Sequence, residues 1–298
     1  MRAAVGLALL AGLLLGSPAQ ATSLRLCDRP LALSITQQDR LFRWAGIIKQ
    51  TLYDSGERVA VVARSGTNLR RIGQRYSHAA ISLKAHDDGP WTVRQLYFAC
   101  DEGRPRLFDQ GLSGFLLDMD EADTGYLTVI TLPPAEADAL ERATLDKASA
   151  LQFLHPVYSA NAYAWGLDYQ NCNQWVAELL AGAWATGDAP VTRRAQAQQW
   201  LREQAYTPSA IQVSAWLMWA SVFVPWVHRS DHPPEALQQH TFHVTMPASI
   251  EAFIQQRLAG ATRTEVCHSG TRVVIHRGWT AMAEGCEPGE GDQVLQLD

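Results

Sequence analysis

An alternating run of residues is the feature that most restricts the fold of this 298-residue chain. From Ser77 to Lys84 apolar residues take every second position, as they do in a strand with one buried face. Turn residues follow over Asp87–Pro90, and a second strand-like run extends from Trp91 to Phe98. Two strands joined by so short a turn pair as a hairpin, so the chain is expected to contain an antiparallel sheet.

Helical patterns surround this hairpin. Thr36 and Asp39 form a capping-box-like start for a helix that continues to Tyr53. Further helices are expected over residues 107–117, 135–154, 172–180, 193–204, 214–224 and 249–258, and further strands over 59–63, 126–132 and 272–276. Helices mixed with antiparallel hairpins predict one α+β domain over residues 22–298. The proline-rich segment 231–235 is the candidate seam for a C-terminal extension.

The first 21 residues resemble a secretory signal peptide. Arg2 precedes an apolar stretch over residues 3–16, and Ala19-Gln20-Ala21 has the A-x-A form of a cleavage site. Cleavage after Ala21 predicts a mature chain in the periplasm or outside the cell. The alternative is an uncleaved anchor, although the apolar run is short for a membrane span.

Five cysteines fit an exported protein, because thiols pair in an oxidising compartment and an odd number leaves one over. Cys267 and Cys286 are 19 positions apart and flank a strand-like segment, so they are expected to close a loop. Pairing Cys27 with Cys100 is a guess by elimination, since spacing does not fix connectivity. That assignment leaves Cys172 as the single thiol.

The net charge and the composition restrict the kinds of molecule that the protein is expected to bind. The net charge of −5 argues against non-specific nucleic-acid binding, and 47% hydrophobic residues exclude a wholly disordered chain. Arg64 and Arg75 flank the hairpin and are expected to be solvated, with an anionic substrate group as the alternative partner. Histidines between His228 and His243 resemble metal ligands, but Pro233-Pro234 interrupts any helix that would align them. No metal site and no cofactor are predicted.

The segment around Cys172 is the strongest candidate for chemistry. Residues 169–174 are polar around the thiol, whereas apolar residues repeat at spacings of three and four from Val176 on. Cys172 is therefore expected in the first turn of a half-buried helix, where free N–H groups and the helix dipole lower a thiol pKa. A nucleophile needs that property. A structural thiol and a disulfide partner are the alternatives.

His78 is the candidate base for this thiol. It lies on the first hairpin strand, on the face opposite the alternating apolar residues, where its neighbours are small. A Cys–His pair within hydrogen-bond reach catalyses acyl transfer through a thioester. Gln95 on the partner strand is expected to orient the ring, and Gln170 to donate to an oxyanion beside the Cys172 N–H. A structural core histidine is the alternative.

Aromatic residues supply two further candidates. The loop before Cys172 carries Tyr158, Asn161, Tyr163, Trp165 and Tyr169, which are expected to line a substrate cleft, with packing around the hairpin as the alternative. The run 216–227 carries aromatic residues at spacings of three and four, which favours a buried core helix. Docking of that run on a membrane surface or a lipid chain is the alternative.

The order of these motifs resembles that of circularly permuted papain-like hydrolases, a group related to NlpC-type amidases and including lecithin:retinol-acyltransferase-like enzymes. In that group a histidine on a strand is followed by another strand and by Asn-Cys-Glu-His-Phe at a helix start. Asn171, Cys172 and the aromatic Trp175 match this motif, while its Glu-His pair has no counterpart here.

The chain as a whole resembles an uncharacterised bacterial secreted family, domain of unknown function 2145, from about residue 27 to residue 260. The resembling segments are Leu41-Phe42, Arg64-Ser65-Gly66, Tyr76-Ser77-His78-Ala79, Gln110-Gly111-Leu112 and Tyr169–Glu178. This family resemblance brings no established reaction.

The resemblances imply a permuted papain-like fold, with an antiparallel sheet packed against the helix that carries the cysteine. The implied activity is that of a cysteine hydrolase or acyltransferase, such as an amidase or peptidase, acting on an amide or ester bond of a cell-wall peptide or a lipid acyl group. Cys172 would attack, and His78 would act as base and then acid. Gln95 would orient the ring without stabilising an imidazolium as a carboxylate does. The alternative is a catalytically inactive periplasmic ligand-binding module.

Overall fold

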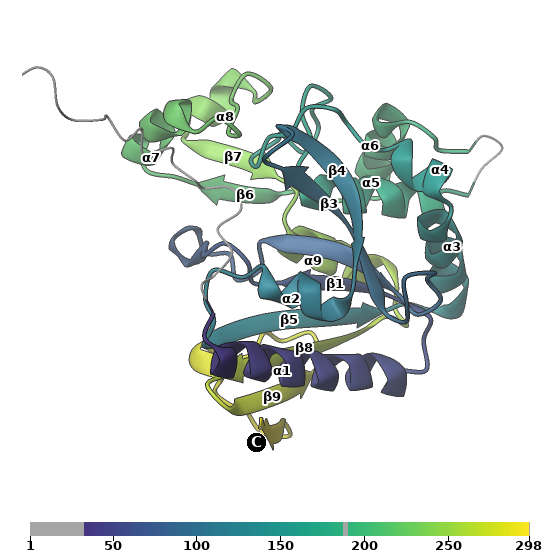
Figure 1. The fold of residues 1–298 in the computed structure, drawn as a ribbon. Helices are drawn as coiled ribbons and strands as arrows, with labels where there is room; N and C mark the ends of the chain where they lie inside the picture. The colour runs from purple at the N-terminus through teal and green to yellow at the C-terminus, as the bar shows by residue number, and fades with distance from the viewer. Residues whose placement is uncertain (1–32, 187–189, 298) are drawn as a thin grey trace, which may run out of the picture. The chain divides into compact units, whose positions relative to one another are not determined.

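An eight-stranded antiparallel sheet organises the chain in the order β10-β9-β8-β5-β1-β2-β3-β4 (Figure 1). The computed structural model describes residues 33–186 and 190–297. The sheet consists of β1 (Val59–Arg64), β2 (His78–Leu83), β3 (Thr92–Ala99), β4 (Arg104–Gln110), β5 (Thr124–Thr131), β8 (Thr262–Ser269), β9 (Arg272–Arg277) and β10 (Gln293–Gln296). The predicted α+β class and the β2–β3 hairpin are confirmed.

Helices cover both faces of the sheet, which is why every residue of β1 is buried. Alternate strand residues point to opposite faces, so each face has its own apolar cluster. One face packs against α1 (Ile35–Asp54) and α2 (Leu112–Leu117). The other packs against α3 (Pro134–Leu145), α4 (Lys147–Leu151), α5 (Cys172–Trp184), α6 (Arg194–Glu203) and α9 (Pro247–Arg257).

The first helix begins two residues earlier than the sequence predicts. Ser34, not Thr36, is the N-cap, and its hydroxyl accepts a hydrogen bond from the N–H of Gln37. The Gln37 side chain accepts in return from the Ser34 N–H, which completes the capping box.

Two other expected helices are only partly formed. Residues 107–110 of the segment predicted as a helix over 107–117 belong to strand β4, whose backbone pairs with β3 from Val93–Gln110 to Ala99–Arg104, and the helix is limited to α2. The helix expected over 135–154 divides at Asp146, whose backbone leaves the helical region. The Asp146 carboxylate then caps α4 by accepting from the N–H groups of Ala148 and Ser149.

A small second sheet pairs β6 (Ser209–Gln212) with β7 (Thr241–Val244), and two short helices, α7 (Ala215–Ala220) and α8 (Pro234–Gln238), lie between these strands in the chain (Figure 1). The segment 231–235, expected as a seam, leads into α8, which is followed by β7 of the small sheet. The chain then returns to the large sheet as β8, β9 and β10. A C-terminal extension stays a prediction.

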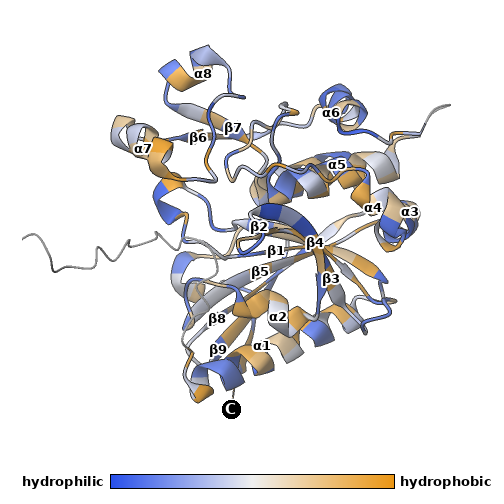
Figure 2. Ribbon diagram, turned by 45° about the horizontal axis from the view of Figure 1, so that its top comes forward, coloured by the Kyte–Doolittle hydropathy of each residue, from blue (hydrophilic) through white to orange (hydrophobic). Residues whose placement is uncertain are grey.

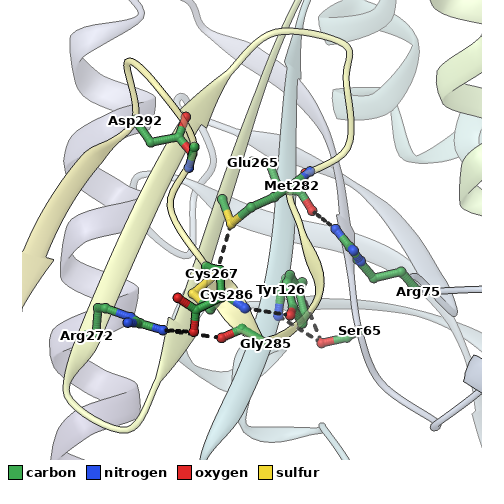
Figure 3. The surroundings of a disulfide bond; sticks show 12 residues. Ser65, Arg75, Tyr126, Glu265, Cys267, Arg272, Met282, Gly285, Cys286 and Asp292 are labelled. Carbon is green, nitrogen blue, oxygen red and sulfur yellow. Dashed lines mark hydrogen bonds and ion pairs between the residues drawn. A yellow bond between two sulfur atoms is a disulfide. The ribbon is translucent and has the colours of Figure 1, made fainter.

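The predicted Cys267–Cys286 disulfide is present and fastens β8 to the 3-10 turn Glu284–Cys286 (Figure 3). Cys100 is also disulfide-bonded. Its expected partner Cys27 and the leader over 1–21 lie outside the described residues. Cys172 is a free thiol, as expected. Within the described part of the chain, no helix combines the length and apolar character needed to cross a bilayer.

Candidate functional site

The helix α5 begins where strands β2 and β3 separate. Their pairing extends from Ile81–Arg94 to Leu83–Thr92 and does not include the first residues of β2. Asn173 occupies this edge of β2, since its Oδ1 accepts from the Ala79 N–H at 2.8 Å and its Nδ2 donates to the Ser77 carbonyl at 3.1 Å. The start of α5 is therefore fixed to the backbone on both sides of His78.

Cys172 is the first residue of α5, as the sequence predicts. Asn171 caps the helix, because its side-chain oxygen accepts from the Gln174 N–H at 2.7 Å. The free N–H groups of Cys172 and Asn173 lower the thiol pKa, but burial has the larger, opposite effect. The pKa of Cys172 is raised to about 11, so the expected lowering is wrong. Desolvation of a buried thiolate outweighs the helix N-terminus here.

Arg64 supplies the positive charge beside this thiol. Its side chain is only 3% exposed, ion-pairs with Asp118 at 2.6 Å, and lies 5.0 Å from the centroid of the Phe115 ring. The expectation of a solvated Arg64 is therefore wrong. The guanidinium lowers the pKa of Cys172, opposing the effect of burial. A Cβ at Gly66 would lie 2.5 Å from an Arg64 nitrogen, which explains the Arg64-Ser65-Gly66 motif.

Tyr158 is a second group that acts on the sulfur. Its hydroxyl, as a hydrogen-bond donor, lowers the pKa of Cys172. Burial and the neighbouring thiol raise the pKa of Tyr158 well above its usual value, so the phenol keeps its proton. The Tyr158 ring stacks on Phe98 of β3 at 5.0 Å. Tyr158 therefore joins the end of the hairpin to the start of α5.

His78 lies at the start of β2 with its ring 5.9 Å from that of Phe115. Burial and the Arg64 charge lower the pKa of His78 to about 3, so the ring is neutral at pH 7. Gln95 has a smaller, opposite effect on this pKa, as an acceptor facing the ring would. His78 Nε2 and Gln95 Oε1 are both buried without a hydrogen-bond partner among the described residues.

The structure places Cys172 and His78 in different packing environments. Cys172 belongs to the apolar cluster on the α5 face of the sheet, whereas Phe115, against which His78 packs, belongs to the cluster on the α1 face. Arg64 acts electrostatically on both groups. The result is a neutral thiol and a neutral imidazole beside one buried guanidinium, not a thiolate–imidazolium pair.

Gln170 has a structural position instead of the expected oxyanion role. Its Nε2 donates to the Phe153 carbonyl at 2.8 Å and to Glu178 Oε2 at 2.6 Å, and its Oε1 accepts from the His155 N–H. Both amide hydrogens are occupied, so none remains for a substrate. Glu178 is also ion-paired with Arg194 at 2.8 Å. Gln170 thus joins the preceding loop to the second turn of α5.

Three of the aromatic residues expected to line a cleft are half-buried and pack on later segments of the chain, whereas Tyr158 packs on Phe98 of the hairpin. The ring contacts of the three are Tyr163 with His232 at 5.4 Å, Tyr169 with His228 at 4.3 Å, and Trp165 with Tyr206 at 5.9 Å. Arg202 also lies 4.5 Å from the Trp165 ring centroid. The contacts of these three rings involve neither the hairpin nor Cys172. A substrate contact of these rings stays a prediction.

One group of side chains among the described residues has ligand atoms close enough to share a metal ion: His86, Asp88 and Asp109, within 4.8 Å of one another. Arg94 already donates to both Asp109 oxygens, at 2.6 and 2.7 Å. This guanidinium neutralises the carboxylate that a cation would need. The histidines considered in the sequence lie elsewhere, and His228 and His232 are engaged in the aromatic contacts above.

The candidate site lies in a part of the chain that matches a known protein family. Residues 51–254 match a family described as "Uncharacterized protein conserved in bacteria (DUF2145)". The chain belongs to the DUF2145 family. No curated protein and no solved structure matches the chain. The match includes Arg64, His78, Gln95 and Cys172. A disulfide in a member of a bacterial family indicates an oxidising environment outside the cytoplasm.

Sequence reasoning missed two groups at this DUF2145 site, the buried charge of Arg64 and the Asn173 carboxamide. It placed Tyr158 in a cleft but did not connect its hydroxyl with Cys172. Arg64 and Asn173 fall in segments that had been noted for their family resemblance, and that was the available signal. The contact of Tyr158 with Cys172 could not be predicted, because it depends on the path of the loop between α4 and α5.

Proposed function

We propose that this DUF2145 protein is an exported thiol enzyme of the permuted papain-like type, which cleaves or transfers an acyl group through Cys172. The supporting observation is a free thiol on which the buried Arg64 guanidinium acts, together with Arg64 Nε, His78 Nε2 and Gln95 Oε1, which are buried without hydrogen-bond partners among the described residues. Native proteins rarely leave such atoms unpaired, and exceptions concentrate at functional sites. The proposed substrate is an amide or ester, as in a cell-wall peptide or a lipid acyl group.

The proposed reaction begins from the neutral thiol. Its proton passes to His78 Nε2 through one water molecule, and Arg64 stabilises the thiolate that forms. The sulfur attacks the carbonyl carbon, and the free N–H groups of Cys172 and Asn173 stabilise the oxyanion. The imidazolium then protonates the leaving amine or alcohol as the C–N or C–O bond breaks. Attack by water on the thioester, with His78 again as base, regenerates the thiol.

The proposal is tested by detecting the covalent acyl-enzyme intermediate. Purified protein is mixed with a p-nitrophenyl acyl ester, quenched in acid and examined by intact mass and peptide mapping. We expect an adduct of one acyl group on Cys172 that hydroxylamine removes, and more than tenfold less adduct for His78→Asn. Tyr53→Phe, which changes an exposed ring on α1, is the matched control and should acylate normally. Turnover retained by Cys172→Ser, or acylation at other residues only, would contradict the proposal.

A second candidate is an inactive ligand-binding module of the same fold. It is favoured by the protonation states, because a thiol of pKa about 11 and an imidazole of pKa about 3 are both uncharged at pH 7. Under this alternative Cys172→Ser folds normally and keeps ligand affinity, and no acyl adduct forms on the wild-type chain. The adduct experiment therefore separates the two candidates.

The proposed location is the periplasm or the cell exterior, after cleavage of the leader following Ala21. Intact mass of the exported protein tests this. The expected N-terminus is Thr22, and an unprocessed Met1 on the purified chain would oppose it.

A further inference from the structure

The segment 215–225, comprising α7 and the 3-10 turn Ser221–Phe223, exposes large apolar side chains and is called the apolar tip below. Trp216, Trp219 and Phe223 are 67%, 61% and 62% exposed, and Leu217 and Val222 are also exposed. The expectation of a buried core helix here is therefore wrong. Figure 2 shows α7, with its apolar colouring, at the outer side of the small sheet, away from the large one.

The apolar tip is held in place by a small core of its own. Met218 is the buried residue of α7 and packs with Ile211 and Phe242 of the small sheet. Its neighbours on α7 therefore point outward. Trp219 and Phe223 contact each other, with ring centroids 5.1 Å apart. Two rings and the adjacent aliphatic side chains thus form one continuous exposed apolar surface on an ordered support.

Two arginines, Arg229 and Arg71, lie near the apolar tip. No acidic residue occurs from Thr207 to Ser230, and the only Lys or Arg in that segment is Arg229. Arg229 donates to the Met218 carbonyl at 3.0 Å, which places its guanidinium at the end of α7. Leu69 and Ile72 pack against the same small core, and the exposed Arg71 lies between them in the chain. Arg71 has no recorded ion pair within the described part of the chain; its neighbour Arg70 pairs with Glu121.

This combination matches the requirements of an anionic bilayer surface. Tryptophan and phenylalanine partition into the interface between headgroups and acyl chains, and basic residues at the edge of an apolar surface are attracted by acidic phospholipids. Six helical residues are too few to cross a bilayer, so the apolar tip would insert only to interfacial depth. An extracytoplasmic bacterial protein also meets a membrane in its own compartment.

We infer that the apolar tip anchors this protein reversibly on the surface of a membrane that contains anionic phospholipid. Insertion of Trp216, Trp219 and Phe223 supplies the apolar contact, while Arg71 and Arg229 contact lipid phosphates. This inference does not depend on the chemistry proposed for Cys172.

Vesicle sedimentation tests the inference. Exported, purified protein is mixed with vesicles of phosphatidylglycerol and phosphatidylethanolamine, and separately with vesicles of phosphatidylcholine, in low salt. We expect binding that is stronger to the anionic vesicles and at least tenfold weaker for the triple variant Trp216→Ser/Trp219→Ser/Phe223→Ser. The matched control Ile35→Ser/Phe42→Ser/Leu167→Ser removes three other exposed apolar side chains and should bind as wild type does. Arg71→Gln should lose several-fold affinity for the anionic vesicles only.

Three results would overturn the inference. Wild-type protein could fail to bind either vesicle, or the triple variant could bind as tightly as wild type. Alternatively, the wild-type protein could fail to bind vesicles and form a dimer in sedimentation velocity, whereas the triple variant stays monomeric. A second copy of the chain would then be the occupant of the apolar tip. Cys172→Ser serves as a further control, because its vesicle binding should be unchanged whether or not the protein is an enzyme.

Discussion

Arg64 is the residue on which the electrostatics of the candidate site depend. Its buried guanidinium lowers the pKa of Cys172 and also that of His78, so it favours a thiolate and disfavours an imidazolium. Thiol enzymes commonly use the imidazolium itself as the positive partner of sulfur. In this protein a permanent charge acts on the sulfur instead, and the same charge opposes protonation of His78.

Replacing Arg64 should therefore slow the reaction of Cys172 with iodoacetamide. The thiolate is the reacting species, so the wild-type rate should rise about tenfold per pH unit below the pKa of about 11. Arg64→Gln should shift this profile to higher pH and lower the rate several-fold at any fixed pH below it. Arg64→Lys keeps the charge and is the control. Equal profiles for Arg64→Gln and wild type would show that the charge does not act on the sulfur.

At the scale of single residues, the sequence predicted the position of Cys172 at the start of a helix but did not predict the burial of Arg64. The position of Cys172 follows from a local pattern, in which polar residues precede an apolar helical repeat. The burial of Arg64 depends on Asp118, 54 positions away, and on Phe115 of α2. The high pKa of Cys172 likewise results from the packing of the whole site, whereas the helix-terminus argument considered one element alone.

Among the elements, the contact between α5 and β2 is the one that builds the site. Asn173 takes the place of a neighbouring strand by pairing with one N–H and one carbonyl of β2. Asn173→Ala leaves both groups buried without a partner, so we expect it to lower the free energy of unfolding by about 2 kcal/mol or more. Urea unfolding measures this. Gln199→Ala, which removes an exposed contact on α6, should change stability by under about 0.5 kcal/mol. Equal effects of the two variants would refute the bridging role.

Two of the strands that the sequence missed, β4 and β8, carry mixed or paired charges. β8 carries Arg263 and Glu265, which are buried and ion-paired with each other at 3.1 Å, so no apolar alternation marks this strand. Arg263 also pairs with Glu251 of α9 at 2.9 Å. Such residues resemble a solvated loop until their partners are known. Strand β4 was missed for a related reason, since it carries Arg104, Arg106 and Asp109 among its seven residues.

For the molecule as a whole, buried neutral histidines make stability depend on pH. His268 is fully buried against the Trp44 ring at 4.5 Å, and neither ring nitrogen has a hydrogen-bond partner among the described residues. Burial lowers the pKa of His268 to about 4, as it lowers that of His78 to about 3. An unfolded histidine titrates near 6.5. Below that pH, the unfolded chain therefore binds protons that the folded chain does not bind.

The free energy of unfolding should accordingly be greatest above pH 6.5 and fall as the pH decreases toward 4. His268→Phe keeps an aromatic ring against Trp44 and removes the titrating group. Between pH 7 and pH 4.5, the decrease in its free energy of unfolding should therefore be about 2–3 kcal/mol smaller than the decrease for the wild-type protein. Urea unfolding at both pH values measures the difference. His240→Asn removes an exposed imidazole at a residue with φ +52, a conformation that asparagine accepts, and should retain the wild-type pH dependence. If His268→Phe lost as much stability on acidification as wild type, the imidazole of His268 would not be the buried neutral group that this packing requires.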